Sequence, residues 1–144
     1  MYRIMLVDDE DNVLSALRRV LTRAEEYAGQ FMVEPYNSPI KALRRALEAQ
    51  FDLIISDFHM PAMDGVAFLV AVRKWQPDAA RIILSGRSDR DMLLSAINHA
   101  EIARFICKPW DNDELVSTLR HVLTQRKVLL DQKRVADQAR LQQG

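Results

Sequence analysis

The sequence is poor in the features that mark secreted, membrane and nucleic-acid-binding proteins. It has one cysteine, Cys107, so no disulfide can form within the chain, as is usual in the cytoplasm. Its longest apolar run, 66–72, is too short to cross a bilayer. Basic and acidic residues number 20 each, so overall charge favours neither a nucleic acid nor a membrane as partner. These features predict a cytoplasmic protein whose charged groups act locally.

The 144 residues are 49% hydrophobic, which is enough for one good core. Short β-rich apolar runs alternate with segments of helical period, a pattern typical of a parallel sheet wrapped by helices. Strands are predicted at 2–7, 31–36, 52–56, 81–85 and 104–107, the last with Cys107 in the core. Helices are predicted at 13–24, 39–48, 66–75, 89–100 and from about 112 onward. The predicted fold class is α/β, a (βα)5 doubly wound five-stranded parallel sheet, flavodoxin-like, with an extended C-terminal helix.

Polar side chains stand at the ends of four predicted strands, where open parallel sheets bind ligands. Asp8 and Asp9 follow the first strand, Asp57 the third, Ser85 ends the fourth, and Lys108 follows the fifth. Converging carboxylates repel one another unless a cation joins them, and Mg²⁺ prefers such oxygen ligands. A hydroxyl and an ammonium group nearby suit a phosphoryl group. The pattern predicts a magnesium site in which Asp57 is a nucleophile toward phosphorus.

Four motifs resemble the receiver domain of bacterial two-component response regulators: VDDE at 7–10, SDFHMPAMDG at 56–65, LSG at 84–86 and FICKP at 105–109. The resemblance covers roughly residues 2–123. It implies a phosphoacceptor domain in which Asp57 receives a phosphoryl group from a sensor histidine kinase or a phosphotransfer protein. It implies no enzymatic activity beyond the domain's own phosphorylation and dephosphorylation.

The same resemblance implies a ligand set for the metal. Asp9, Asp57 and the backbone carbonyl of His59 would bind Mg²⁺ directly, and Asp8 would bind it through water. The side chain of His59 would lie beside the phosphorylation site, where it affects the lifetime of the phosphoryl group. No other cofactor is expected.

The resemblance also implies a conformational switch. Ser85 and Lys108 would bind the phosphoryl oxygens, and Phe105 would turn inward when Ser85 moves. The peptide bond between Lys108 and Pro109 would be cis. Because Phe105 lacks the hydroxyl of a tyrosine, this switch would act through packing alone.

Two other functions stay open at this point. Residues 9–13 match the DxDx(T/V) motif of haloacid-dehalogenase-like phosphatases, with Asp9 as the nucleophile. That function leaves Asp57 and the loop after it unexplained. The second is a receiver-like interaction module that is never phosphorylated, and the presence of every pocket group argues against it. Taken singly, each pocket residue also has a plainer interpretation as a helix cap or a turn residue.

Residues 124–144 differ in composition from the receiver domain predicted at 1–123. From 125 onward they carry five basic and two acidic residues, a net charge of +3, and neither Pro nor Gly until Gly144. They are predicted to form a helical extension or linker toward a missing output domain. FICKPWDNDEL, at 105–115, resembles receivers attached to HD-GYP cyclic-di-GMP phosphodiesterases or transcriptional activators.

The predicted last helix carries apolar residues at 115, 119, 122 and 129, but Arg126 and Lys133 interrupt the stripe, which argues against a strong coiled coil there. A homodimer is expected instead through the face of the fourth helix, the fifth strand and the last helix. Direct contact with nucleic acid is not expected.

Overall fold

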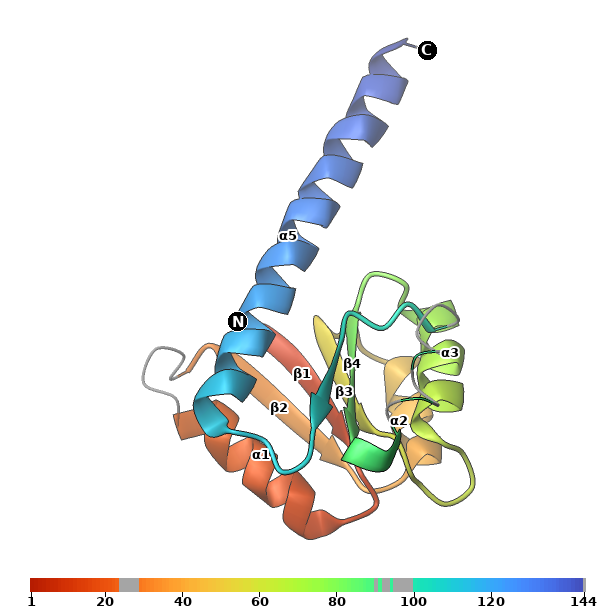
Figure 1. The fold of residues 1–144 in the computed structure, drawn as a ribbon. Coiled ribbons are helices and arrows are strands. Elements are labelled where there is room, and N and C mark those ends of the chain that lie inside the picture. The colour runs from red at the N-terminus through yellow and green to blue at the C-terminus, as the bar shows by residue number, and fades with distance from the viewer. Residues whose placement is uncertain (24–28, 90, 92–93, 95–99, 144) are drawn as a thin grey trace.

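The computed structural model describes residues 1–23, 29–89, 91, 94 and 100–143 (Figure 1). Five strands form one parallel sheet in the order β2-β1-β3-β4-β5: β1 (Tyr2–Val7), β2 (Phe31–Tyr36), β3 (Leu53–Asp57), β4 (Ala80–Ser85) and β5 (Arg104–Cys107). The helices are α1 (Asp11–Arg23), α2 (Pro39–Ala46), α3 (Gly65–Trp75), α5 (Asn112–Gln143) and a short 3-10 helix, η2 (Arg87–Asp89). The predicted fold class is confirmed, while most of the predicted helix at 89–100 lies outside the described residues.

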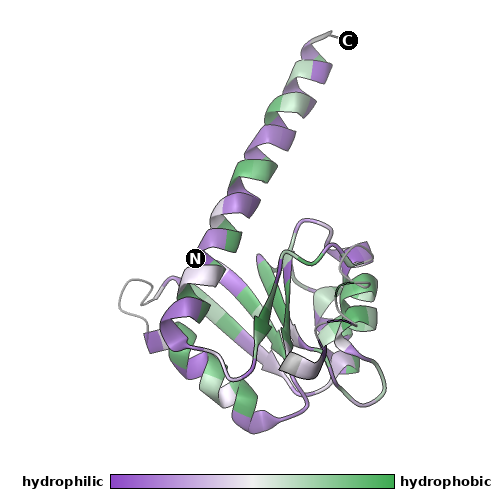
Figure 2. Cartoon of the chain, in the orientation of Figure 1, coloured by the Kyte–Doolittle hydropathy of each residue, from purple (hydrophilic) through white to green (hydrophobic). Residues whose placement is uncertain are grey.

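Helices cover both faces of the sheet (Figure 1), and its central strands are hydrophobic (Figure 2). The strands alternate their side chains between the two layers. Met5 and Val7 of β1 pack in a core with α2 and α3, which supplies the fully buried Phe68. Ile4 and Leu6 pack on the opposite face with α1 and the first turns of α5. Because β3 lies between these two layers, it is buried along its whole length and ends at Asp57.

Polar side chains cap the first turns of two helices, and the one that begins at Pro39 starts where it was predicted. Ser38 accepts a hydrogen bond from the backbone N–H of Lys41 and precedes Pro39 at the first position of α2. Asp64 accepts one from the N–H of Ala67 and starts α3 directly after the loop that follows Asp57. These caps fix where each helix leaves the carboxyl edge of the sheet.

The long helix α5 packs along the body and then projects beyond it (Figure 1). Arg126 anchors it at the edge opposite the strand ends: its Nε donates to the carbonyl of Asp78 at 2.8 Å, and its guanidinium pairs with Asp52 at 3.0 Å. Lys133 pairs with Asp78 at 3.6 Å. The residue that seemed to interrupt an apolar stripe is thus the helix's attachment to the body. Among the described residues, no helix combines the length and hydropathy that a bilayer crossing requires.

The prediction that Cys107 lies in the core is wrong. Its side chain is exposed. The reason is the strand order, because β5 is at the edge of the sheet and Cys107 is its last residue.

Candidate functional site

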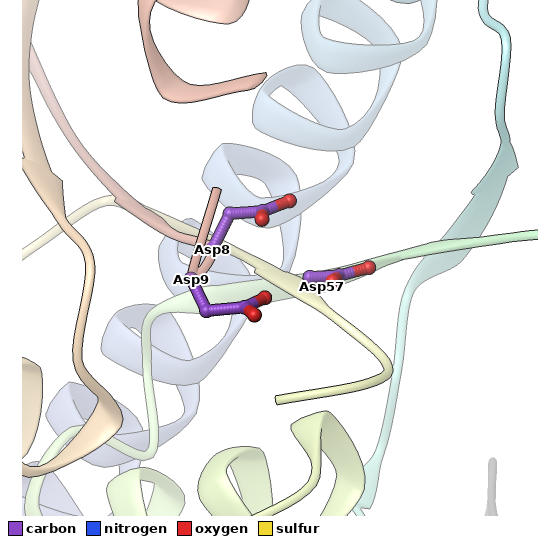
Figure 3. A group of neighbouring side chains, drawn as sticks. All are labelled: Asp8, Asp9 and Asp57. Atoms are coloured by element: carbon purple, nitrogen blue, oxygen red, sulfur yellow. The ribbon is translucent and has the colours of Figure 1, made fainter. Parts of the chain in front are cut away.

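Three carboxylates meet where β1 and β3 end (Figure 3). One oxygen each from Asp8, Asp9 and Asp57 lies within 4.8 Å of the others. Asp8 is fully buried and Asp57 nearly so, while Asp9 is exposed. The cluster therefore has a buried floor and one side open to solvent.

Lys108 extends from the end of β5 into this cluster. Its Nζ lies 3.0 Å from Oδ1 of Asp57 and 3.2 Å from Oδ2 of Asp8. Its backbone N–H donates to the carbonyl of Ser85 at 2.8 Å, which joins the ends of β4 and β5. The Lys108–Pro109 peptide bond is cis, as predicted. The ammonium group is thus shared by two carboxylates from different strands.

Burial and charge shift the pKa of both partners in this contact. Burial raises the pKa of Asp8, as does the charge of Asp57, and the N–H of Glu10 and the ammonium of Lys108 offset this only in part. For Lys108, burial lowers the pKa, but the hydrogen bond to Asp57 and the charges of Asp8 and Asp57 outweigh it, so that the pKa is raised. The single ammonium group does not fully compensate the negative charge of the cluster. The ionised form of Asp8 is therefore disfavoured in the folded protein.

This imbalance predicts that Asp8→Asn stabilises the protein in the presence of a chelator at neutral pH. The folded state raises the pKa of Asp8 above its ordinary value of 3.8, so ionisation costs more in the folded chain than in the unfolded one. Below that value the carboxyl is protonated in both states and the cost is absent. The cost grows as the pH rises from 3.8 to the raised pKa and stays constant above it. The urea midpoint of the variant should therefore exceed that of the wild type at neutral pH, and the difference should vanish in acid.

Asp113→Asn is the matched control, since Asp113 is exposed in the first turn of α5. Its charge interacts favourably with the helix dipole, so this variant should not gain stability. Equal gains in both variants, or a loss for Asp8→Asn at neutral pH, would contradict the account of the cluster.

The loop after Asp57 is held tightly against the site. The N–H of Phe58 donates to Oδ1 of Asp57 at 3.0 Å, and the N–H of Gly65 donates to the carbonyl of Phe58 at 2.8 Å. A Cβ at position 65 would overlap the carbonyl oxygen of Asp57 and lie 3.1 Å from Cα of Phe58. Glycine is required there because the backbone of Asp57 and Phe58 passes too close for any side chain.

His59 has a partner that the sequence did not reveal. Its Nε2 lies 2.7 Å from Oδ1 of Asp89, and its ring meets Phe58 edge-on at 4.7 Å between centroids. Asp89 is buried, and its Oδ2 accepts the N–H of Gly86 at 3.1 Å. The pair joins the loop after β3 to the loop after β4. The two residues are 30 positions apart, and no local pattern connects them.

The two predicted switch residues lie on neighbouring strands. Ser85 is the last residue of β4, and only 2% of its surface is exposed. In the register of the parallel strands it lies beside Cys107 of β5. Phe105 of β5 pairs with Ile83, is partly buried and packs against the core formed with α2 and α3. The partial exposure of Phe105 leaves it room to become more buried.

The donor set suits a hard cation. The three side chains that converge offer only carboxylate oxygens, the ligands preferred by Mg²⁺ and Ca²⁺. The ring of His59 is directed to Asp89, so only its backbone carbonyl enters the predicted set. Asp8, Asp9 and Asp57 are therefore the side chains able to hold a divalent ion.

Comparisons with known proteins agree with this geometry. The family model described as "Response regulator receiver domain" matches residues 4–120. The hydrogenase transcriptional regulatory protein HoxA of Cupriavidus necator is 34% identical over 120 residues, which are 83% of this chain and 24% of that protein. The C4-dicarboxylate transport transcriptional regulatory protein DctD of Rhizobium meliloti is 32% identical over 131 residues, 90% of this chain and 27% of that protein. The chain thus spans about a quarter of the length of these curated relatives.

Solved structures of similar shape carry related descriptions. The signal receiver domain of an HD domain-containing protein from Pseudomonas fluorescens Pf-5 has a TM-score of 0.81 and 31% identity, covering 90% of this chain and 92% of that one. A response regulator receiver domain protein from Clostridium thermocellum has a TM-score of 0.79 and 25% identity, covering 90% of this chain and 99% of that one. Sequence and shape point to the same kind of domain.

Proposed function

The chain belongs to the response regulator receiver domain family of two-component signalling, and from this premise we propose that Asp57 is its phosphoacceptor. One observation carries the assignment: Lys108 bridges Oδ1 of Asp57 and Oδ2 of Asp8 beside an open carboxylate cluster. A cation fixed beside the acceptor offsets the charge that develops during phosphoryl transfer. Receivers are signalling modules, and we propose that this one catalyses only its own phosphorylation and dephosphorylation.

The contacts of Asp57 suggest which of its oxygens reacts. Oδ1 accepts from the N–H of Phe58 and pairs with Lys108, each at 3.0 Å. We assign Oδ2 as the nucleophile. It forms a bond to the phosphorus of a phosphohistidine on a sensor kinase or phosphotransfer protein while the phosphorus–nitrogen bond breaks. The leaving imidazole nitrogen keeps the electron pair, and the product is an acyl phosphate on Asp57.

We propose that Mg²⁺ is the ion of this site, held by Asp9, Asp57 and the carbonyl of His59, with Asp8 acting through water. The family and the oxygen-only cluster support this choice. When bound, the ion neutralises phosphoryl oxygens. Lys108 then remains to bind a phosphoryl oxygen, and the buried hydroxyl of Ser85 supplies a donor from the neighbouring strand.

A switch follows from the same groups. The phosphoryl group draws the hydroxyl of Ser85 toward it, the loop to Asp89 follows, and Phe105 turns into the space that this movement vacates. We propose that the change alters self-association through β5, α5 and the segment before them. The predicted fourth helix of that face lies mostly outside the described residues.

The proposal extends to the whole protein. We assign 1–123 to the receiver and 124–144 to a helical extension that leads to an output domain. The names of the relatives, which are transcriptional regulators, and a similar receiver from an HD domain-containing protein support an output of either kind. We also propose a cytoplasmic location, a prediction that rests on the single cysteine.

The test is labelling by acetyl phosphate with Mg²⁺, followed by intact mass and by mapping of the modified residue. We expect one phosphoryl group per chain and none in a chelator. Lys108→Met should slow labelling about 100-fold, the usual cost of losing one group that stabilises transition-state charge. Lys127→Met, which removes an exposed ammonium group from α5, is the control and should label at the wild-type rate. Labelling that is equal in both variants would remove Lys108 from the site.

A further inference from the structure

Asp89 is a buried carboxylate in a loop beside the site. It is the last residue of the short helix η2, and only 9% of its side chain is exposed, whereas the side chain of its partner His59 is 68% exposed. A carboxylate is seldom buried unless its oxygens find hydrogen-bond donors. The donors that satisfy Asp89 are therefore the groups whose positions it fixes.

The two oxygens of Asp89 hold two different segments of the chain. Oδ2 accepts the backbone N–H of Gly86 at 3.1 Å, and the N–H of Asp89 donates to the carbonyl of Gly86 at 3.2 Å, so residues 86–89 form a closed loop. Oδ1 lies 2.7 Å from Nε2 of His59, which belongs to the loop 58–64 after β3. One side chain thus closes the loop after β4 and ties it to the loop that follows the proposed phosphoacceptor.

The loop 86–89 begins directly after Ser85, the residue proposed to move on phosphorylation. The loop that carries His59 has its own attachment to the sheet, because the N–H of Phe58 donates to the carbonyl of Leu84 at 2.9 Å. A hydrogen bond tolerates little stretching. If the loop 86–89 follows Ser85 by about 1 Å, the contact between His59 and Asp89 lengthens beyond hydrogen-bond range.

We propose that His59 and Asp89 form a latch, which holds residues 86–89 in the unphosphorylated arrangement and breaks when the switch operates. This inference rests on the proposed function, because it concerns the movement that follows phosphorylation of Asp57. The latch favours the unswitched form while Asp57 carries no phosphoryl group, and it lowers the fraction of molecules that switch without one. Two polar side chains thus set the resting level of the switch.

The latch acts on the position of a loop rather than on the core. The ring of His59 is mostly exposed, and both partners lie in loops at the carboxyl edge of the sheet. Nε2 of His59 donates a hydrogen bond both in the imidazolium form and in the neutral tautomer that is protonated at this atom, so the contact does not require a charged ring. Loss of the latch should shift the equilibrium between the two arrangements and leave the sheet and its helices folded.

Nuclear magnetic resonance of the 144-residue chain tests the latch. The reporter is the backbone amide of Phe105, and beryllofluoride with Mg²⁺ mimics the phosphorylated state. Asp89→Asn keeps the size of the side chain but leaves one acceptor oxygen for two donors. In this variant the unliganded resonance should lie closer to the position of the saturated wild type. The half-saturating concentration of beryllofluoride should fall at least about tenfold, because apparent affinity rises with the fraction of competent molecules.

Asp91→Asn is the matched control, because it removes the same charge from an exposed side chain two residues further on. It should titrate like the wild type, which separates the latch from a general loss of negative charge near an anion. His59→Leu should shift the resonance in the same direction as Asp89→Asn, whereas His59→Gln retains an N–H donor and should stay closer to the wild type. The double variant of His59→Leu and Asp89→Asn should titrate like Asp89→Asn alone, since both changes remove one contact.

Failure of the latch and failure of the proposed function give different results. A wild type that responds to beryllofluoride, with Asp89→Asn titrating like Asp91→Asn, would overturn the latch and leave the switch. Additive effects in the double variant would overturn it as well. A wild type whose Phe105 resonance does not respond would reject the switch, and the latch with it. Circular dichroism should show every variant folded, and the two His59 variants decide the question if Asp89→Asn does not fold.

Discussion

Replacing Asp57 by asparagine is expected to remove all phosphoryl label from the chain, from one group per molecule to none. The amide is not a nucleophile toward phosphorus, while its shape still allows the contacts of Oδ1 with Lys108 and with the N–H of Phe58. The fold should therefore persist, and because one buried charge is lost from the cluster, stability should not fall. Intact mass after incubation with acetyl phosphate and Mg²⁺ measures the result.

Asp9→Asn separates the proposed function from the phosphatase alternative. Asp9 is the exposed member of the cluster and is proposed only as a metal ligand. Its loss should weaken the dependence of labelling on Mg²⁺ and slow the reaction, but label that forms should still map to Asp57. Label that survives in Asp57→Asn and disappears in Asp9→Asn would favour a haloacid-dehalogenase-like nucleophile instead. Label that maps elsewhere in the wild type would reject both assignments.

Gly65→Ala is expected to be the most destabilising single methyl addition near the site. The new Cβ would overlap the carbonyl oxygen of Asp57 and crowd Cα of Phe58, and neither belongs to a side chain that is able to rotate away. Overpacking costs typically 1–3 kcal/mol, and we expect about 3 kcal/mol or more here, since backbone must move. The displaced backbone carries Asp57, the proposed phosphoacceptor, so labelling of the folded protein should also slow. Urea denaturation and the labelling assay measure the two effects.

Gly86→Ala is the matched control for that substitution. A Cβ at position 86 would meet Oδ2 of Asp89 at 3.6 Å, an ordinary contact, and the N–H of Gly86 would still donate to the same carboxylate. Its stability should stay within about 0.5 kcal/mol of the wild type. A large loss in both variants, or in neither, would show that the close approach at Gly65 is not what limits stability.

The residues of the site were predictable because charged and polar side chains directly follow the apolar runs that form the strands. A parallel sheet brings the carboxyl ends of its strands to one edge, so Asp8, Asp57 and Lys108 were expected to meet, and their distances are now known. The partnership of His59 and Asp89 was not predictable, since it depends on how two loops lie in space. No periodic pattern describes such loops.

The sequence pattern also predicted neither the order of the strands in the sheet nor the burial of a charged side chain. The apolar run ending at Cys107 predicts a strand, but not that the strand lies at the edge of the sheet. Arg81 is 5% exposed in β4, where its Nε donates to the carbonyl of Ala100 and its guanidinium to that of Ala79, both at 2.8 Å. An arginine normally indicates a surface, and only the assembled fold supplies the carbonyl oxygens that make its burial tolerable.

Because Arg126 attaches α5 to the body part-way along its length, a tilt at the start of the helix would move its far end. The helix begins at Asn112, a few residues after Lys108, and its fulcrum lies where Arg126 meets Asp52 and Asp78, just before β3 and β4 begin. From Arg126 to Gln143 the helix is about 26 Å long, and the exposed ion pair of Lys133 with Asp78 is a further contact along this length. A tilt of about 5° at the pocket end would carry the tip through roughly 2 Å, a displacement of the size that helix interfaces translate into a change of state.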